Sequence, residues 1–186
     1  MARKTLHMGL ILLAAGVLNL AGCPLPAQPV ALSQAILDME QRVLDQVNEE
    51  RSARGLTVLV MDEALREVAR AHSEDRVARG FFSHINPDGK DPFDRMADAG
   101  ITYSWAGENL AMNNTRPQAD VAVASWMISE SHRENLFLAQ FNRAGVGVAG
   151  TSAGLYYFTM DFIGTDDKSD DAPQPWREES LEPVEE

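Results

Sequence analysis

The hydrophobic positions between residues 33 and 143 recur every three or four residues in several stretches, and capping residues bound these stretches. This spacing is typical of amphipathic helices that bury one face. The predicted helices run from Ser33 to the residue before Gly55, from Asp62 to Gly80, from Pro92 to Ala99, and from Pro117 through Trp126.

After residue 143 the pattern becomes that of extended chain. Residues 145–148 and 156–162 are rich in β-formers, and the turn-like sequence Thr151-Ser152-Ala153-Gly154 lies between them, which predicts a hairpin. We expect residues 101–103 and 110–112 to supply a third strand. Helices around a small, mostly antiparallel sheet place the chain in the α+β class.

The N-terminal segment has the layout of an export signal. Arg3 and Lys4 precede a short apolar run, which predicts a signal peptide over residues 1–22 and is too short to favour a spanning helix. The run ends in Leu20-Ala21-Gly22-Cys23, which resembles the lipobox of bacterial lipoproteins. That resemblance implies a lipid on Cys23 and a membrane anchor. The alternative is an ordinary signal peptide that leaves a free cysteine.

The segments on either side of the predicted domain have a different composition from it. Residues 23–32 are rich in proline and predict an extended tether, whereas residues 165–186 are acidic and predict a disordered tail. The folded domain is therefore expected over residues 33–164. Pro24 follows the cysteine where Asp would mark inner-membrane lipoproteins, so we expect an outer-membrane lipoprotein facing the periplasm or the cell surface.

Charge and cysteine content exclude several classes of function. The chain has 16 Lys plus Arg against 28 Asp plus Glu, a net charge of -12, which disfavours nucleic acid as a partner. Its one cysteine excludes an intramolecular disulfide and a cysteine-rich zinc site.

Three histidines follow Cys23, and each has a plain structural interpretation beside a functional one. His72 lies on the apolar face of a predicted helix, so a hydrogen-bonded core histidine is expected. His84 lies in a loop-forming stretch, whereas His132 follows Ser131, which can cap a short helix. Glu108 is flanked by apolar chain, so it is either buried with a partner or solvated on a turn.

Spacing alone assigns no chemistry, because the chain has no His-Glu-x-x-His, Gly-x-Ser-x-Gly or phosphate-loop motif. If His84, Glu108 and His132 converge, they can hold Zn²⁺ with an open position or share proton transfer. Scattered surface histidines are the alternative.

Seven ordered motifs between Leu37 and Gly164 together resemble the CAP superfamily, in particular its bacterial extracellular branch with SCP-like domains. The motifs are Asn48-Glu49-Glu50-Arg51, Ala71-His72-Ser73, Phe82-Ser83-His84, Gly107-Glu108-Asn109-Leu110-Ala111, Trp126-Met127-Ile128-Ser129, Ser131-His132-Arg133-Glu134-Asn135 and Gly145-Val146-Gly147-Val148.

The resemblance implies an α-β-α sandwich with a cleft lined by a His, Glu, Glu, His tetrad, whose histidines can bind a divalent metal such as zinc. By motif, His84, Glu108 and His132 match three members. The second Glu falls at Ser129, so the tetrad is incomplete. Glu130, about 100° further around a helix, is expected to point elsewhere.

Other residues follow from the same resemblance. Arg133 and Asn135 lie beside the cleft in the family, although both can be structural, with Arg133 pairing an acid and Asn135 bonding backbone. Without disulfides, stability must come from the core, to which aromatic side chains contribute. These are Phe81, Phe82, Trp126, Phe141, Tyr156, Tyr157, Phe158 and Phe162.

Three hypotheses about function follow. The first is a lipid-anchored binding module that holds a small apolar or lipid-like ligand, or a protein partner, in the cleft, with or without a metal on His84 and His132. The second is a metal-assisted hydrolase in which Glu108 activates water. The third is a structural envelope protein with a vestigial cleft. Ser129 in place of a carboxylate handicaps the hydrolase, so we favour binding.

Overall fold

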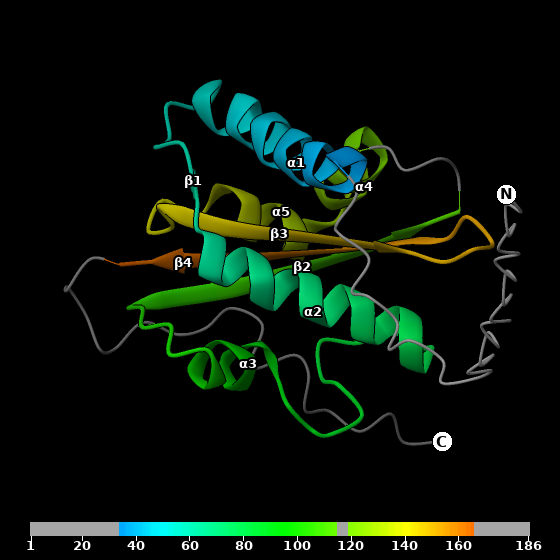
Figure 1. The fold of residues 1–186 in the computed structure, drawn as a ribbon. Coiled ribbons are helices and arrows are strands. Elements are labelled where there is room, and N and C mark those ends of the chain that lie inside the picture. The colour runs from blue at the N-terminus through cyan, green and yellow to red at the C-terminus, as the bar shows by residue number, and fades with distance from the viewer. Residues whose placement is uncertain (1–33, 115–118, 166–186) are drawn as a thin grey trace, which may run out of the picture. The chain divides into compact units, whose positions relative to one another are not determined.

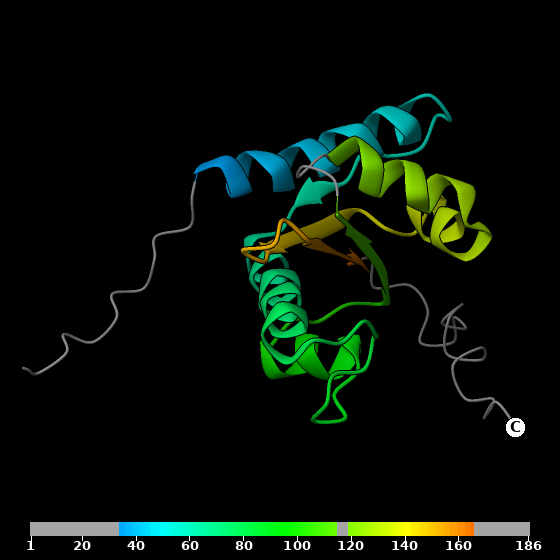
Figure 2. The same cartoon turned by 90° about the vertical axis from the view of Figure 1, so that its right-hand side faces the viewer.

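The computed structural model describes residues 34–114 and 119–165. In these residues a central sheet lies between two layers of helices (Figures 1 and 2). Helices α1, α4 and α5 cover one face and α2 and α3 cover the other, so the expected α-β-α sandwich of the α+β class is confirmed. The elements are α1 (Gln34–Ser52), β1 (Val60–Met61), α2 (Glu63–Arg79), α3 (Pro92–Asp98), β2 (Trp105–Asn113), α4 (Ala119–Ile128), α5 (Glu130–Phe137), β3 (Arg143–Gly150) and β4 (Tyr156–Gly164).

The sheet has the strand order β1-β3-β4-β2. Strands β3 and β4 form the predicted antiparallel hairpin, β2 pairs with β4 in antiparallel fashion, and the short β1 runs parallel to β3. Strand β2 therefore lies at one edge of the sheet. No helix within the described ranges has the length and apolar character needed to cross a membrane.

Helix α2 packs directly on the backbone of β3 because two glycines leave room for it. A Cβ added to Gly145 would lie 2.3 Å from the carbonyl carbon of Leu65, and one added to Gly147 would lie 2.0 Å from the amide nitrogen of Arg70. Val146 and Val148, which alternate with these glycines, join the core on the other face. The motif Gly-Val-Gly-Val thus permits one close helix contact and one packed core.

The core under α1, α4 and α5 contains most of the predicted aromatic residues. Trp126, Phe141, Phe158 and Phe162 are fully buried, and the rings of Phe141 and Phe162 stack with centroids 5.3 Å apart. Phe82 is an exception, because it is exposed on the loop after α2 and its ring lies over the Arg76 guanidinium. The expectation that Phe82 is a core residue was wrong.

The predicted helix ends that fall within the described residues are confirmed. Asp62 caps α2 through its side chain, which accepts from the amide of Leu65, and Gly80 ends the helix with a φ of 68°. Ser33, Pro117 and Cys23 lie outside the described residues, as do residues 1–22, the tether, and the tail beyond Thr165. The domain boundaries there stay predictions.

The third strand was predicted only in part: residues 110–112 lie in β2. Residues 101–103 lie outside the sheet, and β2 is a single strand that pairs with β4 at nine consecutive positions from Trp105 to Asn113. Gly107, Glu108 and Asn109 at its centre are residue types that sequence preferences disfavour in strands, which concealed it. Strand β1, two residues long, is too short to produce a period.

Candidate functional site

His84 lies on the loop between α2 and α3 and contacts a buried carboxylate on β2. Its ring Nδ1 lies 2.6 Å from Oε1 of Glu108, and the Glu108 side chain is buried. Arg95 of α3 donates from Nη2 to the other oxygen of Glu108, at 2.5 Å. Glu108 is therefore buried with partners rather than solvated on a turn.

These contacts determine the charge of Glu108. Burial alone raises the pKa of a carboxyl group, but the hydrogen bond with His84 and the positive charge of Arg95 outweigh it, and the pKa of Glu108 lies well below its usual range. Glu108 is therefore ionised at neutral pH, with both of its oxygens in hydrogen bonds.

His132 lies in the first turn of α5 and has a neutral partner. Its Nδ1 lies 2.7 Å from the hydroxyl oxygen of Ser129, the residue at the N-cap position of α5. The Ser129 side chain makes no capping bond to the backbone. Ser131 lies within the helix rather than capping it, so that alternative was wrong. Burial lowers the pKa of His132, and the charge of His84 lowers it further.

Two adjacent residues of β2 hold the two histidine-bearing segments. Successive side chains of a strand point to opposite faces, so Glu108 reaches His84 while Asn109 reaches α5. The Asn109 amide donates to the main-chain oxygen of His132 at 2.9 Å, and it accepts from Asn135 at 3.0 Å. The edge strand thus holds the two histidine-bearing segments at one edge of the sheet, one from each face.

The remaining residues of the Gly-Glu-Asn-Leu stretch have steric and bonding roles. A Cβ on Gly107 would lie 3.1 Å from the Phe141 ring and 3.2 Å from Oδ1 of Asn135, so a larger residue would press on α5. The Trp126 indole donates to the carbonyl of Leu110 at 2.9 Å, which satisfies an acceptor of the edge strand.

The Asn48–Arg51 motif acts on the same region from α1. The Asn48 amide exchanges two hydrogen bonds with the backbone of Leu59, at 2.7 and 2.8 Å. The buried Arg51 guanidinium donates to four carbonyls, which include two at the end of α5. The acceptors are Thr57, Leu136, Leu138 and Phe141. This motif is architectural and fixes the helix that carries His132.

The other predicted site residues make no hydrogen bond to a histidine ring within the described ranges. Glu130 is exposed, and among the described residues it makes no hydrogen bond to either histidine, as expected. Arg133 donates to the carbonyl of Met127 at 3.0 Å rather than pairing with an acid, so the ion-pair expectation was wrong for the described ranges. Asn135 donates to the main-chain oxygen of Glu108 at 3.3 Å, which confirms its structural alternative.

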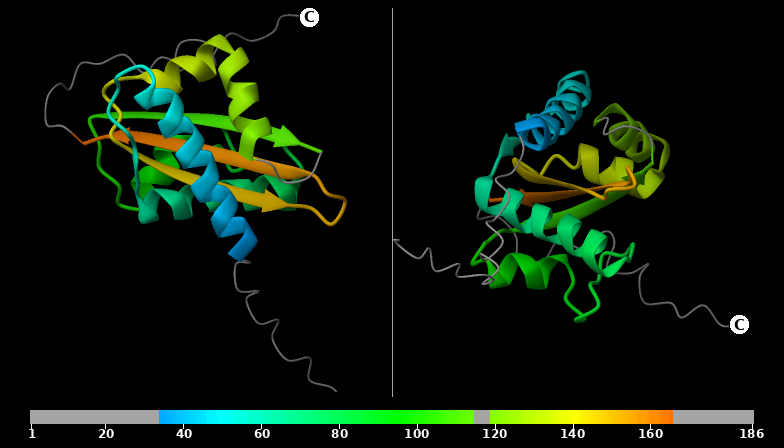
Figure 3. Two further views of the ribbon diagram at one scale, coloured as in Figure 1. Left: turned by 90° about the horizontal axis from the view of Figure 1, so that it is seen from above. Right: turned by 45° about the vertical axis from the view of Figure 1, so that its right-hand side comes forward.

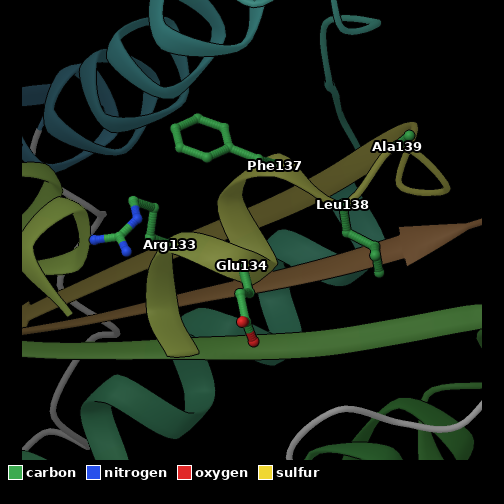
Figure 4. Close-up of a pocket in the computed structure, with 5 residues that line it drawn as sticks. All are labelled: Arg133, Glu134, Phe137, Leu138 and Ala139. Carbon is green, nitrogen blue, oxygen red and sulfur yellow. The ribbon is translucent and has the colours of Figure 1, made fainter. Parts of the chain in front are cut away.

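Arg133 also belongs to a surface hollow of about 430 Å³ along α5. Phe137 and Glu134 leave the helix in opposite directions there (Figure 4). The Phe137 ring lies 4.1 Å from the guanidinium carbon of Arg54. The hollow is lined by Arg133, Glu134, Phe137, Leu138 and Ala139.

Sequence reasoning missed two ionisable residues beside Glu108. Arg95 carried no signal, because its contact depends on how α3 packs near β2. Asp161 lies directly opposite Glu108 on β4, fully buried, and neither of its carboxyl oxygens has a hydrogen-bond partner. Burial raises the pKa of Asp161 well above its usual range, and Glu108 raises it further. An acid inside the otherwise β-forming run 156–162 was the available signal.

His72 is a core residue, as expected. It is buried, and its Nε2 donates to the carbonyl of Ser83 at 3.1 Å, next to His84 in the chain. Burial lowers the pKa of His72 to about 4, so the ring is neutral and supports the loop without charge. Its Nδ1 is buried without a hydrogen-bond partner.

Few side chains of the site are available to ligate a metal ion. Within the described ranges, no group of three or more His, Cys, Asp or Glu side chains is arranged to hold an ion. Glu108 has both oxygens in hydrogen bonds, and Nδ1 of each ring is hydrogen-bonded as well. A metal would have to use Nε2 of His84 and of His132, one ligand fewer than the three protein ligands usual for catalytic zinc.

Comparisons with known proteins identify the family of this chain. The uncharacterized protein YkwD of Bacillus subtilis is 38% identical over 125 residues, which cover 67% of this chain and 47% of that protein. The uncharacterized membrane protein YlbC of the same organism is 36% identical over 124 residues, which cover 67% of this chain and 34% of that one. The chain therefore spans about half the length of one curated relative and a third of the other.

Solved structures agree on the fold. An extracellular SCP-domain protein from Bacillus anthracis is 31% identical with a TM-score of 0.66, covering 77% of this chain and 45% of that one. An outer surface protein from Borrelia burgdorferi has a TM-score of 0.64 at 20% identity, covering 69% of this chain and 94% of that one, which shows the fold alone. The profile of the cysteine-rich secretory protein family matches residues 44–162, more than half of the sequence. This chain therefore belongs to the cysteine-rich secretory protein, or CAP, family.

Proposed function

We propose that this chain is an exported CAP domain, anchored by a lipid on Cys23, that binds a small apolar ligand at the site formed by His84, Glu108 and His132. The export signal and lipobox in the sequence support the location. Two similar structures are described as an extracellular and an outer surface protein, which supports it further. We place the anchor in the outer membrane because Pro24 follows the cysteine.

One observation carries the binding proposal: large apolar side chains are exposed within a few residues of His84 and His132 in the chain. Phe82 and Ile85, on the same loop as His84, are 53% and 43% exposed, and Ile128, next to Ser129, is 85% exposed. Exposed large apolar residues beside a few fixed polar groups are typical of a ligand site. The arrangement suits a ligand with one polar end and an apolar body.

The hydrogen bonds of Glu108 favour binding over hydrolysis. A general base must bring an oxygen within hydrogen-bonding distance of the water that it activates. Both oxygens of Glu108 already bond His84 and Arg95, and the side chain is buried. Activating water would require this network to open. The metal-assisted hydrolase is therefore the weaker hypothesis, and the vestigial cleft remains an outcome of the test.

A divalent metal such as Zn²⁺ is part of the proposal only as an ion held by two imidazoles. When bound, it would supply positive charge for the polar end of the ligand. Glu108 and Ser129 would orient the two rings through their Nδ1 atoms, as outer hydrogen-bond partners of metal-binding histidines do. With only two protein ligands, we expect weak binding that His84→Ala abolishes in a calorimetric titration with Zn²⁺.

The ligand site is tested with a fluorescent fatty acid as the probe and the full chain carrying Cys23→Ser. We expect saturable binding that weakens at least tenfold in Phe82→Ser/Ile85→Ser and in His84→Ala/His132→Ala. Val60→Ser, at an apolar position on β1 that is 59% exposed, is the matched control and should bind as the parent does. Equal binding by all variants would contradict the site. No binding by the parent would favour a vestigial cleft.

The anchor is tested separately by growing cells with a clickable fatty acid. The parent chain should become labelled and sediment with membranes, whereas Cys23→Ser should remain unlabelled. Label on both chains, or on neither, would contradict the lipid on Cys23.

A further inference from the structure

Arg95 connects parts of the site that nothing in the sequence placed together. Its Nη2 donates to Oε2 of Glu108 at 2.5 Å. Its Nη1 donates to the main-chain oxygen of His84 at 2.7 Å and to that of Lys90 at 3.2 Å. The Arg95 guanidinium thus holds three parts of the site together. They are the Glu108 carboxylate, the main chain of His84, and Lys90 at the far end of the His84 loop.

The planar shape of the Arg95 guanidinium allows it to hold Glu108 and the His84 backbone at the same time. The guanidinium is planar and presents several donors in a fixed fork, whereas a lysine ammonium is a point charge at the end of a flexible stem. Because the Arg95 side chain is almost fully buried, its fork has one orientation relative to β2. The distance between the His84 backbone and the Glu108 carboxylate is therefore set through Arg95.

No other cation in the described neighbourhood can replace Arg95. Arg76 is fully buried near Glu108, but its guanidinium donates to the carbonyls of Phe158 and Ala111 and to the hydroxyl of Thr159. Asp161, opposite Glu108 on the neighbouring strand, is itself an acid and supplies no positive charge. Without Arg95, the Glu108 carboxylate would be buried beside an acid with His84 as its remaining partner.

We propose that Arg95 is a positioning residue for His84: it holds Glu108 and the His84 backbone together so that Nδ1–H of the ring donates to Glu108 and Nε2 is the nitrogen offered to a ligand. The role of Nε2 rests on the proposed function, whereas the orientation of the ring does not. A carboxylate that accepts from one ring nitrogen fixes the tautomer of a histidine and the direction of its ring.

The test is a direct observation of the His84 tautomer by ¹⁵N NMR of the full Cys23→Ser chain, assigned with His84→Ala. The parent should show the Nδ1–H form. Arg95→Leu should lose that signature, and Arg95→Lys should recover part of it, because the ammonium restores the charge without the fork. Arg143→Leu is the matched control, since Arg143 pairs with Asp62 at 3.1 Å, a pair separate from the His84 network.

Binding of Zn²⁺ alone supplies the second readout. We expect Arg95→Leu to weaken it about tenfold, because the change releases Glu108, the partner behind the His84 ring, and losing such a partner costs about 10- to 100-fold. Arg143→Leu should leave it unchanged. A purely structural arginine would change thermal stability while leaving the tautomer and the Zn²⁺ affinity of the folded variant as in the parent.

Each outcome decides the inference. An Nε2–H ring in the parent, or an Nδ1–H ring that persists in folded Arg95→Leu, overturns it. If Arg95→Leu does not fold, Arg95→Lys decides in the same way: a reduced Nδ1–H signature supports the role and an unchanged one overturns it. If the parent binds neither Zn²⁺ nor the fatty acid, the proposed function fails while the tautomer still reports on Arg95.

Discussion

The two histidines of the site are held by opposite kinds of chemistry. His84 contacts an ionised, buried carboxylate that is itself paired with Arg95, whereas His132 contacts the neutral hydroxyl of Ser129. Charge-assisted hydrogen bonds are about twice as strong as neutral ones, but a buried charge is costly once its partner is removed. The His84 half is therefore fixed firmly and is sensitive to change, and the His132 half is more tolerant.

The two histidines also differ in the face of the sheet from which each is held. Glu108 and Asn109 are neighbours on β2, and they serve one histidine each from opposite faces of the strand. Helix α5, which carries His132, lies on the same face of the sheet as α1, which crosses over the strands (Figure 3). The loop of His84 follows α2 on the other side. Substitutions at these two adjacent positions should therefore affect different layers of the molecule.

The largest effect is expected from Glu108→Gln. Removing the charge leaves Arg95 buried without its counter-ion, and breaking a buried pair from one side typically costs about 3–5 kcal/mol. The free energy of unfolding, from urea titration, measures the loss. Glu63→Gln is the control, because Glu63 pairs with Arg66 at 3.3 Å at an exposed position and should cost well below about 1 kcal/mol. Equal losses would show that burial does not make the Glu108–Arg95 pair costly to break, which would contradict the sensitivity assigned to the His84 half.

A smaller effect is expected from Asn109→Ala. The change removes the donor to the His132 carbonyl and the acceptor for Asn135, all in buried surroundings, at a cost of about 1–3 kcal/mol. Hydrogen exchange should become faster in α5 and remain unchanged in the loop of His84. Glu108→Gln should show the reverse pattern. Faster exchange in both segments for either variant would contradict the separation of the layers.

The fold was predictable from sequence where the signal is local. The three- to four-residue spacing of apolar positions predicts α1 to α3, and Asp62 and Gly80 mark the two ends of α2. The turn between β3 and β4 predicts the hairpin. Strand β2 was predicted only in part, because its central residues serve the site and depart from strand preferences. His84, Glu108 and His132 were recognised by motif. Arg95 was not, since only the packing of α3 near β2 brings its guanidinium to Glu108.

As the pH falls, the His132 half of the site should lose its contribution to stability at a higher pH than the half formed by His84 and Glu108. Burial lowers the pKa of His132 in the folded state, so its contribution is present above about 6.5, the unfolded value, and is lost as the pH falls below it. The lowered pKa of Glu108 keeps its contribution constant until the pH falls below about 4.3.

The pH prediction is tested by the difference in unfolding free energy between the parent and His132→Gln. We expect this difference to shrink between pH 7.5 and pH 5. A difference that stays constant over this range would show that His132 titrates alike in the folded and unfolded states.

The smallest effect on stability, and the sharpest test of the comparison, is expected at Ser129. Ser129→Ala removes one neutral hydrogen bond from His132 and should cost about 0.5–1.5 kcal/mol.

Ser129→Glu instead offers His132 a carboxylate, the kind of partner that His84 already has. A carboxylate behind a metal-binding histidine raises the basicity of the ring, so Zn²⁺ should bind about tenfold more tightly by calorimetry. Ser131→Glu adds the same charge at an exposed position two residues further on and should not reproduce the gain. If the two glutamates act alike, the gain comes from overall charge; if only the one at position 129 acts, the neutral partner of His132 is what limits metal affinity in this chain.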